Sequence, residues 1–427
     1  MKTGFLRAAL LLAGLLSPLS PAWAQAADAE LLARAARIHD RRPNLDHHLD
    51  IPFEYGSSEL DAGNDGPSQF DLPKAARGHL RGAVVALFVP QAERTEAGYR
   101  AAAGKAEQKL AIVQAVAERY PERVAIARSP QELREIEASG RFAIVLSILN
   151  GYPLGKDLSA LDDWYARGVR VFGFTHNGNN DLADSSRPHL LKGDRLGEHG
   201  GLSALGREAV GRLNDLGIVV DVSQISGQAL EQVLALTRAP VVASHSNARA
   251  IIDHPRNLDD AQLLAIKRNG GLVAVNAYSA WVRPLPPEAV AEANAVRRKY
   301  GVPEEAVVAG VQPTTEEGVS VLDAETFARY SEEFHAITGG EKYRASLAEY
   351  VDQIDYVVGK IGIDHVGISS DFNHGGGVTG WQDVGDSLNV TAELLRRGYS
   401  DEDVAKLWGG NFLRVWAQVQ ALAAGGG

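Results

Sequence analysis

A histidine and an aspartate stand two residues apart in the stretch NLDHHLDIP, at His48 and Asp50. An imidazole nitrogen and a carboxylate oxygen are both good zinc ligands, and burying either group is costly unless something pairs with it. The stretch therefore predicts part of a metal site, to which other segments must add ligands. A hydrogen-bonded pair that fixes the first loop is the alternative. His47 is expected to point away, because neighbouring side chains of a strand alternate.

Similar residue types recur where other short apolar runs of the chain end. Imidazoles, carboxylates and amides can bind a metal, donate a hydrogen bond or move a proton. The residues at these ends are Leu149 with Asn150, His176, Gln224, His245, Asn276 and Asp371. We therefore expect a functional site built from the ends of several strands.

Each of these candidates also has a purely structural interpretation. His176 could organise the Asn-rich loop that follows it, a role we expect for Asp184, and His245 could be a hydrogen-bonded core histidine. Asp371 could cap a helix, and Arg256 could be a surface ion-pair partner. Only convergence of these residues in space favours the functional interpretation.

Eight apolar runs supply the elements that would position these residues. They cover 44–50, 82–89, 142–149, 170–176, 217–223, 240–246, 271–276 and 364–371. Most are β-branched without alternation, which is typical of parallel strands covered on both faces. Helical patterns such as 202–217 and 258–271 lie between them. This order predicts an α/β fold, a (β/α)8 barrel of the TIM type, in which the carboxyl ends of the strands form the active-site mouth. An open doubly wound sheet is the alternative, but no Gly-x-Gly-x-x-Gly follows the first run.

The N-terminus predicts a secretory signal peptide over residues 1–24. Lys2 and Arg7 flank an apolar run that is too short to span a bilayer, and Ala22-Trp23-Ala24 fits a cleavage site. We expect the remainder, 25–427, to be one barrel domain in the periplasm, without a transmembrane segment. The stretch at about 281–345 is expected to be a helical insertion that acts as a lid.

Composition excludes several classes of function. The 427 residues carry a formal net charge of −11, which disfavours a nucleic-acid partner. The chain has no cysteine, so disulfides, thiolate metal sites and a cysteine nucleophile are excluded.

Several motifs of the chain resemble the membrane (renal) dipeptidase family of zinc metallopeptidases. In order along residues 44–415 they are LDHHLDIP, NGYPLG, GVRVFGFTHNGNNDLADS, GLSALGREAVGRLNDLGIVVDVS, SHSNARAIIDHPRNLDD and GISSDFNHGGG. The resemblance implies an amidohydrolase-type (β/α)8 barrel, two zinc ions bridged by a glutamate and a water, hydrolysis of dipeptides, and a homodimer.

The resemblance also implies metal ligands, and two of them are replaced. His48 and Asp50 match ligands of the first zinc, and His245 matches a ligand of the second. Leu149 stands where the family has its bridging glutamate, and Gln224 where it has a second-zinc histidine. Leucine has no lone pair, and an amide oxygen is a poor zinc ligand. Without the bridging anion, repulsion between two cations is uncompensated. We expect zinc to be weakly bound or absent, with at most one ion.

The groups that would hold a substrate are intact. His176 matches the histidine that stabilises the oxygen of the tetrahedral intermediate, and Asp371 the group that relays a proton to the leaving amine. Arg256 matches the arginine that binds the substrate carboxylate. Tyr152 and Asn276 are further candidates for substrate binding.

Three functions remain open, each with a small peptide or a peptide-derived metabolite as the ligand. The favoured one is a family member that has lost or altered dipeptide hydrolysis, since relatives of this kind act in the periplasmic maturation of siderophores such as pyoverdine. The alternatives are an active zinc metallodipeptidase and a non-catalytic binding protein.

Overall fold

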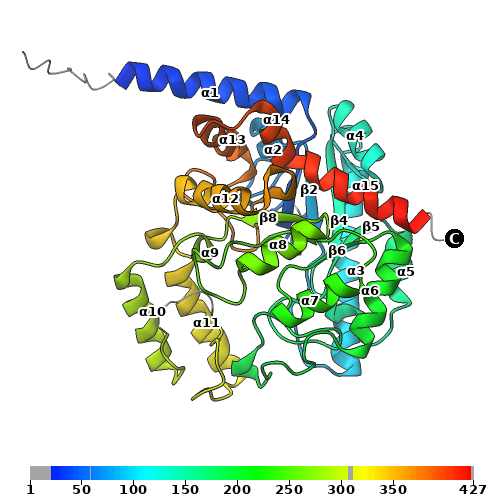
Figure 1. Ribbon diagram of the computed structural model, residues 1–427, viewed down its shortest axis with the longest axis vertical. Helices are drawn as coiled ribbons and strands as arrows, with labels where there is room; N and C mark the ends of the chain where they lie inside the picture. Colours follow the sequence, from blue (N-terminus) through cyan, green and yellow to red (C-terminus); the bar gives the residue numbers. More distant parts are fainter. Residues whose placement is uncertain (1–20, 58, 306–310, 425–427) are drawn as a thin grey trace, which may run out of the picture.

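Parallel strands form the centre of the protein in the computed structural model, which describes residues 21–57, 59–305 and 311–424 (Figure 1). The described strands are β1 (Asp46–Asp50), β2 (Gly82–Ala86), β3 (Val124–Ile126), β4 (Phe142–Ile148), β5 (Val169–Gly173), β6 (Val219–Asp221), β7 (Val242–Ala243), β8 (Leu272–Asn276) and β9 (Val366–Ser369). Their order is β1-β2-β4-β5-β6-β7-β8-β9, all pairs are parallel, and β3 pairs only with β4.

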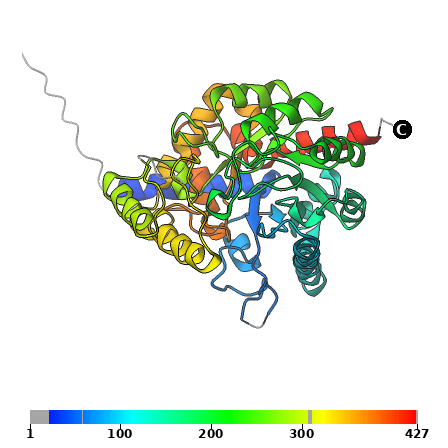
Figure 2. The same cartoon turned by 90° about the horizontal axis from the view of Figure 1, so that it is seen from below.

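The last strand lies beside the first, which brings the two edges of the sheet together. Leu49 forms a parallel bridge with Phe372, and the Asp50 amide donates to the Phe372 carbonyl at 2.9 Å. The Asp371 amide donates to the His48 carbonyl at 3.0 Å. The nearly closed sheet, with helices outside it (Figure 2), confirms the predicted (β/α)8 barrel.

Helices connect the strands and cover the barrel from outside. They are α1 (Pro21–Arg41), α2 (Leu72–Arg77), α3 (Glu96–Arg119), α4 (Pro130–Ala138), α5 (Ala160–Ala166), α6 (Ala204–Leu216), α7 (Gly227–Leu236), α8 (Asp260–Arg268), α9 (Ser279–Val282), α10 (Pro287–Lys299), α11 (Ala324–Thr338), α12 (Leu347–Ile361), α13 (Ser387–Arg396), α14 (Asp401–Ala405) and α15 (Asn411–Ala424). The helical patterns at 202–217 and 258–271 become α6 and α8. Asp259 and Gln262 form a capping box at the start of α8.

The strand β3 was not predicted. Its three residues lie in a largely polar segment, and its register pairs Val124 with Phe142 at the beginning of β4. So short an apolar run has no periodicity by which a sequence pattern could identify it. The predicted runs are also longer than most of the observed strands, at the start, at the end or at both. Where a run continues past the end of its strand, as after β2, β5 and β9, its last residues form loops of the mouth.

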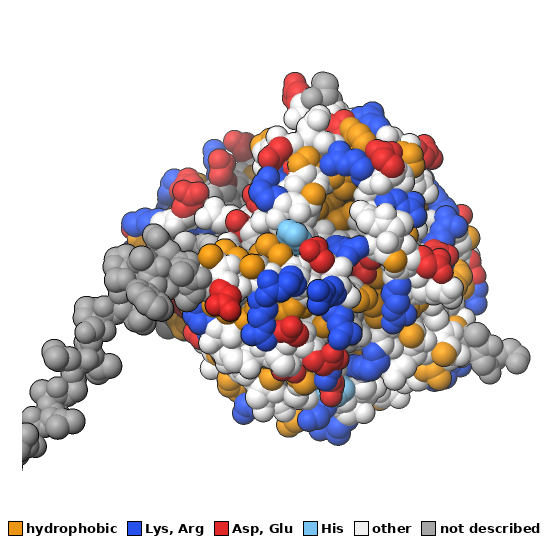
Figure 3. Space-filling view, turned by 90° about the horizontal axis from the view of Figure 1, so that it is seen from above, with side chains coloured by type: hydrophobic (Ala, Val, Ile, Leu, Met, Phe, Trp, Pro, Cys, Tyr) orange, Lys and Arg blue, Asp and Glu red, His pale blue; other side chains and the backbone are white. Residues whose placement is uncertain are grey.

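The segment at about 281–345 contains α10 and α11, which lie side by side beside the barrel (Figure 1). They enclose an apolar cluster of their own, with Tyr330 and Phe334 fully buried in it. The predicted signal peptide falls mainly in residues 1–20, outside the described residues. Among the described helices, none is long and apolar enough to cross a membrane. Acidic and basic side chains lie next to one another on the face viewed in Figure 3.

Candidate functional site

The carboxyl ends of the strands bring most of the predicted site residues into one buried cluster. The His48 ring, on β1, stacks on the His245 ring with centroids 3.9 Å apart and an interplanar angle of 12°. Nε2 of His48 lies 3.8 Å from Oδ1 of Asp371. The Asn276 side-chain amide donates to Oδ2 of Asp371 at 3.1 Å. First and last strands thus meet here, as expected for the mouth of such a barrel.

Backbone strain marks the turns that leave the strands at this mouth. Asn150 after β4, Gln224 after β6 and Asp371 after β9 have φ angles of 75°, 69° and 58°. The left-handed region costs a residue other than glycine about 1–3 kcal/mol, and such residues cluster at functional sites. Among the described residues other than glycine, four of the five with a positive φ lie at this end, Asn373 included, and His79 lies at the other. Their distribution supports placing the site at this end of the barrel.

A lysine that the sequence patterns did not single out faces the first-strand aspartate. Lys109, on α3, places Nζ 2.6 Å from Oδ1 of Asp50, and the two side chains are only 3% and 5% exposed. The Ile51 amide donates to the same oxygen at 2.6 Å, and Nδ1 of His374 lies 3.1 Å from Oδ2. Lys109 also lies 5.0 Å from the centre of the Phe53 ring. Both oxygens of Asp50 are therefore engaged by protein donors.

His374 links this ion pair to the predicted catalytic histidine. Its Nε2 lies 3.1 Å from Nε2 of His176, and both rings pack against Phe88 at 4.5 Å. Burial, and then the nearby His374, lower the pKa of His176 well below its usual value. His176 is therefore neutral at pH 7, so one of these two nitrogens donates its proton to the other.

His245 lies in the middle of a chain of hydrogen bonds. Arg187 donates to Oε1 of Gln224 at 2.5 Å, and Nε2 of Gln224 lies 2.8 Å from Nε2 of His245. On the other side, Nδ1 of His245 lies 2.7 Å from the Ser244 hydroxyl, which donates to Asp221 at 2.5 Å. Because the serine proton is given to Asp221, Nδ1 of His245 is the donor to Ser244 and Nε2 accepts from Gln224. Burial lowers the pKa of His245, in keeping with this neutral form.

The predicted substrate-binding residues occupy different places. Arg256 is buried beside His245, whose carbonyl accepts from its guanidinium, and it also donates to the Ser246 hydroxyl at 3.2 Å. Tyr152 donates to the Glu93 carbonyl at 2.6 Å, so its hydroxyl is already engaged by the loop between β2 and α3.

Two further side chains behave as their structural interpretations predict. His47 turns away from the mouth, with Nδ1 2.7 Å from the Ile368 carbonyl and its ring against Phe412. Asp184 accepts hydrogen bonds from the His199 and Gly201 amides and so organises its loop.

The model of the family described as membrane dipeptidase (peptidase family M19) matches residues 32–425. The chain belongs to the membrane dipeptidase family. It is 45% identical to the solved probable dipeptidase PvdM of Pseudomonas aeruginosa, with a TM-score of 0.88 over 92% of this chain and 99% of that one. Dipeptidase verJ of Clonostachys rogersoniana is 28% identical over 92% of this chain and 88% of its own. Dipeptidase tcpJ of Claviceps purpurea is 27% identical over 83% of this chain and 70% of its own.

Membrane dipeptidases as a family use zinc, but the residues present here do not fit a two-zinc centre. Leu149 is buried and offers no donor atom where the bridging carboxylate is expected. Asp50 faces an ammonium, and both ring nitrogens of His245 are engaged. Among the histidines that the structure describes, only His48 has two buried ring nitrogens without a hydrogen-bond partner. Within the described ranges, no group of three or more His, Cys, Asp or Glu residues is arranged to hold a metal ion.

The sequence patterns did not single out three residues that make close contacts at the mouth, namely Lys109, Arg187 and His374. His374 lies in the motif GISSDFNHGGG, three residues after Asp371, and could have been found there. Lys109 lies within a helix and Arg187 within a long loop. Nothing in their local sequence distinguishes them from surface cations.

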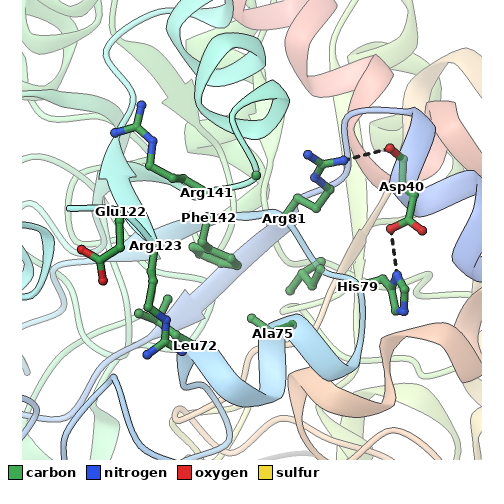
Figure 4. Close-up of a pocket in the computed structure, with 12 residues that line it drawn as sticks. Asp40, Leu72, Ala75, His79, Arg81, Glu122, Arg123, Arg141 and Phe142 are labelled. Carbon is green, nitrogen blue, oxygen red and sulfur yellow. Dashed lines mark hydrogen bonds and ion pairs between the residues drawn. The ribbon is translucent and has the colours of Figure 1, made fainter. Parts of the chain in front are cut away.

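A cavity of about 370 Å³ lies at the opposite end of the barrel (Figure 4). It opens beside Arg81 and Phe142, where β2 and β4 begin, and His79 there contacts Asp40 at 2.8 Å. In barrels of this type the amino-terminal face contributes stability, whereas catalysis occurs at the carboxyl ends. The candidate site is therefore the cluster around His48 and His245.

Proposed function

We propose that this membrane dipeptidase homologue binds a small peptide or peptide-derived metabolite in the barrel mouth and has lost zinc-dependent hydrolysis of dipeptides. We further propose that it acts in the periplasm in the maturation of a peptidic siderophore such as pyoverdine. The contact of the Lys109 ammonium with Asp50 carries the first part of this proposal. The likeness to the probable dipeptidase PvdM, together with the motifs, supports the second.

The lysine opposes a metal because it brings a positive charge to the carboxylate that would bind one. A unit charge 4 Å from a divalent ion repels it by about 8 kcal/mol at an effective dielectric constant of 20. The ammonium also contacts Oδ1 of Asp50, one of the two oxygens with which this carboxylate could bind a metal. Leu149 removes the bridge in addition, so no step of the proposed role passes through a metal.

The remaining side chains suit the holding of a ligand. Arg256 offers a planar guanidinium to a carboxylate. Oδ1 of Asp371 is buried and has no hydrogen-bond partner, and it faces the unpartnered Nε2 of His48. An acceptor and an imidazole placed together in this way can bind an amine or amide group of a ligand, and can exchange a proton with it.

Zinc analysis with reversion variants tests the proposal. We expect purified wild-type protein to hold well below one zinc per chain and to release no amino acid from a panel of dipeptides. The variant Leu149→Glu/Gln224→His restores the two replaced donors and should gain little zinc. Adding Lys109→Ala should raise the zinc content to about one per chain or more, because the competing cation is gone.

Lys105→Ala is the matched control, because Lys105 lies on the same helix but is exposed. In the Leu149→Glu/Gln224→His background it should leave the zinc content unchanged. Two zinc ions per wild-type chain with rapid turnover of simple dipeptides would contradict the proposal and indicate an active metallodipeptidase.

The physiological part needs a separate test. Deleting the gene should leave the use of dipeptides intact while a siderophore precursor accumulates. A normal siderophore profile in the deletion strain would refute the proposed role in maturation, and would leave metal-free binding standing.

A further inference from the structure

Two arginines, Arg187 and Arg256, lie at the mouth. The family resemblance assigns a role to Arg256 but none to Arg187. Arg187 comes from the long loop after β5 and donates one N–H to Gln224 at 2.5 Å. The centre of the Trp281 ring lies 5.4 Å from its guanidinium carbon. Its Nε is buried and has no hydrogen-bond partner. Gln224 and Trp281 thus fix the Arg187 guanidinium, while its Nε–H has no partner.

Arg256 is arranged in the same way around the same histidine. It donates to the His245 carbonyl and to the Ser246 hydroxyl, while its Nε is also buried without a partner. Arg187 reaches that histidine through Gln224, since the amide of Gln224 contacts both. His245 and its neighbours therefore fix the two guanidinium groups relative to each other.

Neither arginine has an acidic partner. In the parts of the chain that the structure describes, no carboxylate forms an ion pair within 4.0 Å of Arg187 or Arg256, whereas Lys109 nearby has Asp50. Two acids act on Arg256 from further away, and both accept hydrogen bonds from other side chains, although Oδ1 of Asp371 has no partner. Asp371 accepts from Asn276, and Asp221 accepts from the Ser244 hydroxyl.

The two cations also act on each other. Burial, and next to it the charge of Arg187, lower the pKa of Arg256 to about 9. A buried cation without an opposite charge is costly, and two of them close together cost more. Such an arrangement is stabilised when an anionic ligand supplies the missing charges.

A small cavity adjoins Arg187. Its volume is about 140 Å³, and Arg187, His254, Ser186 and Gln312 are among the residues that line it. The Ser186 hydroxyl and the Gln312 carbonyl oxygen are buried and have no hydrogen-bond partner. The cavity is therefore lined by an arginine with one unpartnered N–H and by an unused hydroxyl, which can both donate to an anionic group.

We infer that the mouth binds a ligand with two anionic groups, a carboxylate held by Arg256 and a second acidic group held by Arg187 beside this cavity. The inference rests on the proposed function, because it assumes that a peptide-like ligand enters the mouth. It narrows the ligand class to peptides or peptide derivatives with an acidic side chain near the terminal carboxylate. Arg187 is then a specificity-determining residue.

Calorimetric titration with three dipeptides tests this inference. The probes are Ala-Glu, its neutral isostere Ala-Gln, and Ala-Ala. We expect wild-type protein to bind Ala-Glu at least tenfold more tightly than Ala-Gln or Ala-Ala. Arg187→Gln should abolish this preference and leave the affinity for Ala-Gln within about twofold, and Arg187→Lys should retain part of it. Arg195→Gln is the matched control, because Arg195 lies in the same loop with its side chain 81% exposed, and it should change nothing.

The outcomes separate the two hypotheses. Equal affinity of wild-type protein for Ala-Glu and Ala-Gln would overturn the inference while the proposed function stands. Weakening of both peptides by Arg187→Gln would assign Arg187 only the task of holding Gln224, and would also overturn it. If wild-type protein bound none of the three peptides, both the inference and the proposed function would be wrong.

Discussion

Single side chains decide the chemistry available at this mouth, and Lys109 is the clearest case. A lone buried ammonium or carboxylate is far more costly than the pair that Lys109 and Asp50 form. Lys109 contacts one oxygen of Asp50, and His374 contacts the other. A residue on a helix thus supplies the counter-charge of an aspartate at the end of a strand.

Lys109→Met should lower the free energy of unfolding by about 3–5 kcal/mol, because it leaves Asp50 buried without its counter-charge. Urea denaturation of wild-type and variant protein measures the difference. The double variant Asp50→Asn/Lys109→Met should recover part of the loss, since the uncompensated carboxylate is then removed.

Lys105→Met, at an exposed position of the same helix, should shift the midpoint little. A double variant as unstable as Lys109→Met alone would show that lost packing, and not the unpaired charge, causes the destabilisation.

At the amino-terminal end of the barrel, the end of α4 contacts the segment that leads into β1. Glu137, near the end of α4, is buried and accepts a hydrogen bond from the Asn44 amide just before β1 at 3.2 Å. Burial raises the pKa of Glu137 to about 8. The carboxyl is therefore largely protonated at pH 7, and ionising it would place a charge in the buried contact between α4 and β1.

The stability contributed by this proton depends on pH. The folded-state pKa of Glu137 is raised, so its contribution is complete below the ordinary glutamate value and is lost as the pH rises through about 8. Glu137→Gln, which stays neutral, should unfold at a higher temperature than wild type at pH 9, by the equivalent of about 2 kcal/mol, and should resemble it at pH 4.5. Thermal melts at both pH values measure this. Glu135→Gln, exposed on the same helix, should show no such crossover.

Over the whole molecule, burial of neutral histidines dominates the response to acid. The pKa is lowered for eight histidines among the described residues, namely His39, His47, His48, His176, His189, His245, His254 and His335. It is raised for only three carboxyls there, Asp46, Glu137 and Asp383. Nine other described carboxyls have a lowered pKa, so they too lose stability on acidification and do not oppose the histidines.

We expect the free energy of unfolding to fall by at least about 3 kcal/mol between pH 6.5 and pH 4.5. A histidine whose folded-state pKa is lowered contributes stability above its ordinary pKa, and this is lost as the pH falls towards the lowered value, about 4 for His39 and His47. Urea unfolding at the two pH values tests the sign. Constant or increasing stability on acidification would show that the three carboxyls prevail.

The architecture could be predicted from the sequence alone. Parallel strands that are buried on both faces require uninterrupted apolar runs, and the helices between them require amphipathic patterns. The sequence also predicts that the bridging ligand is missing, since Leu149 has no donor atom in any conformation. The ion pair of Asp50, in contrast, is visible only in the folded chain. Lys109 and Asp50 are 59 residues apart in the chain and meet because α3 packs against the barrel. Ion pairs and hydrogen bonds of this kind depend on distances that no local pattern records, and the same holds for the chain from Arg187 through Gln224 to His245.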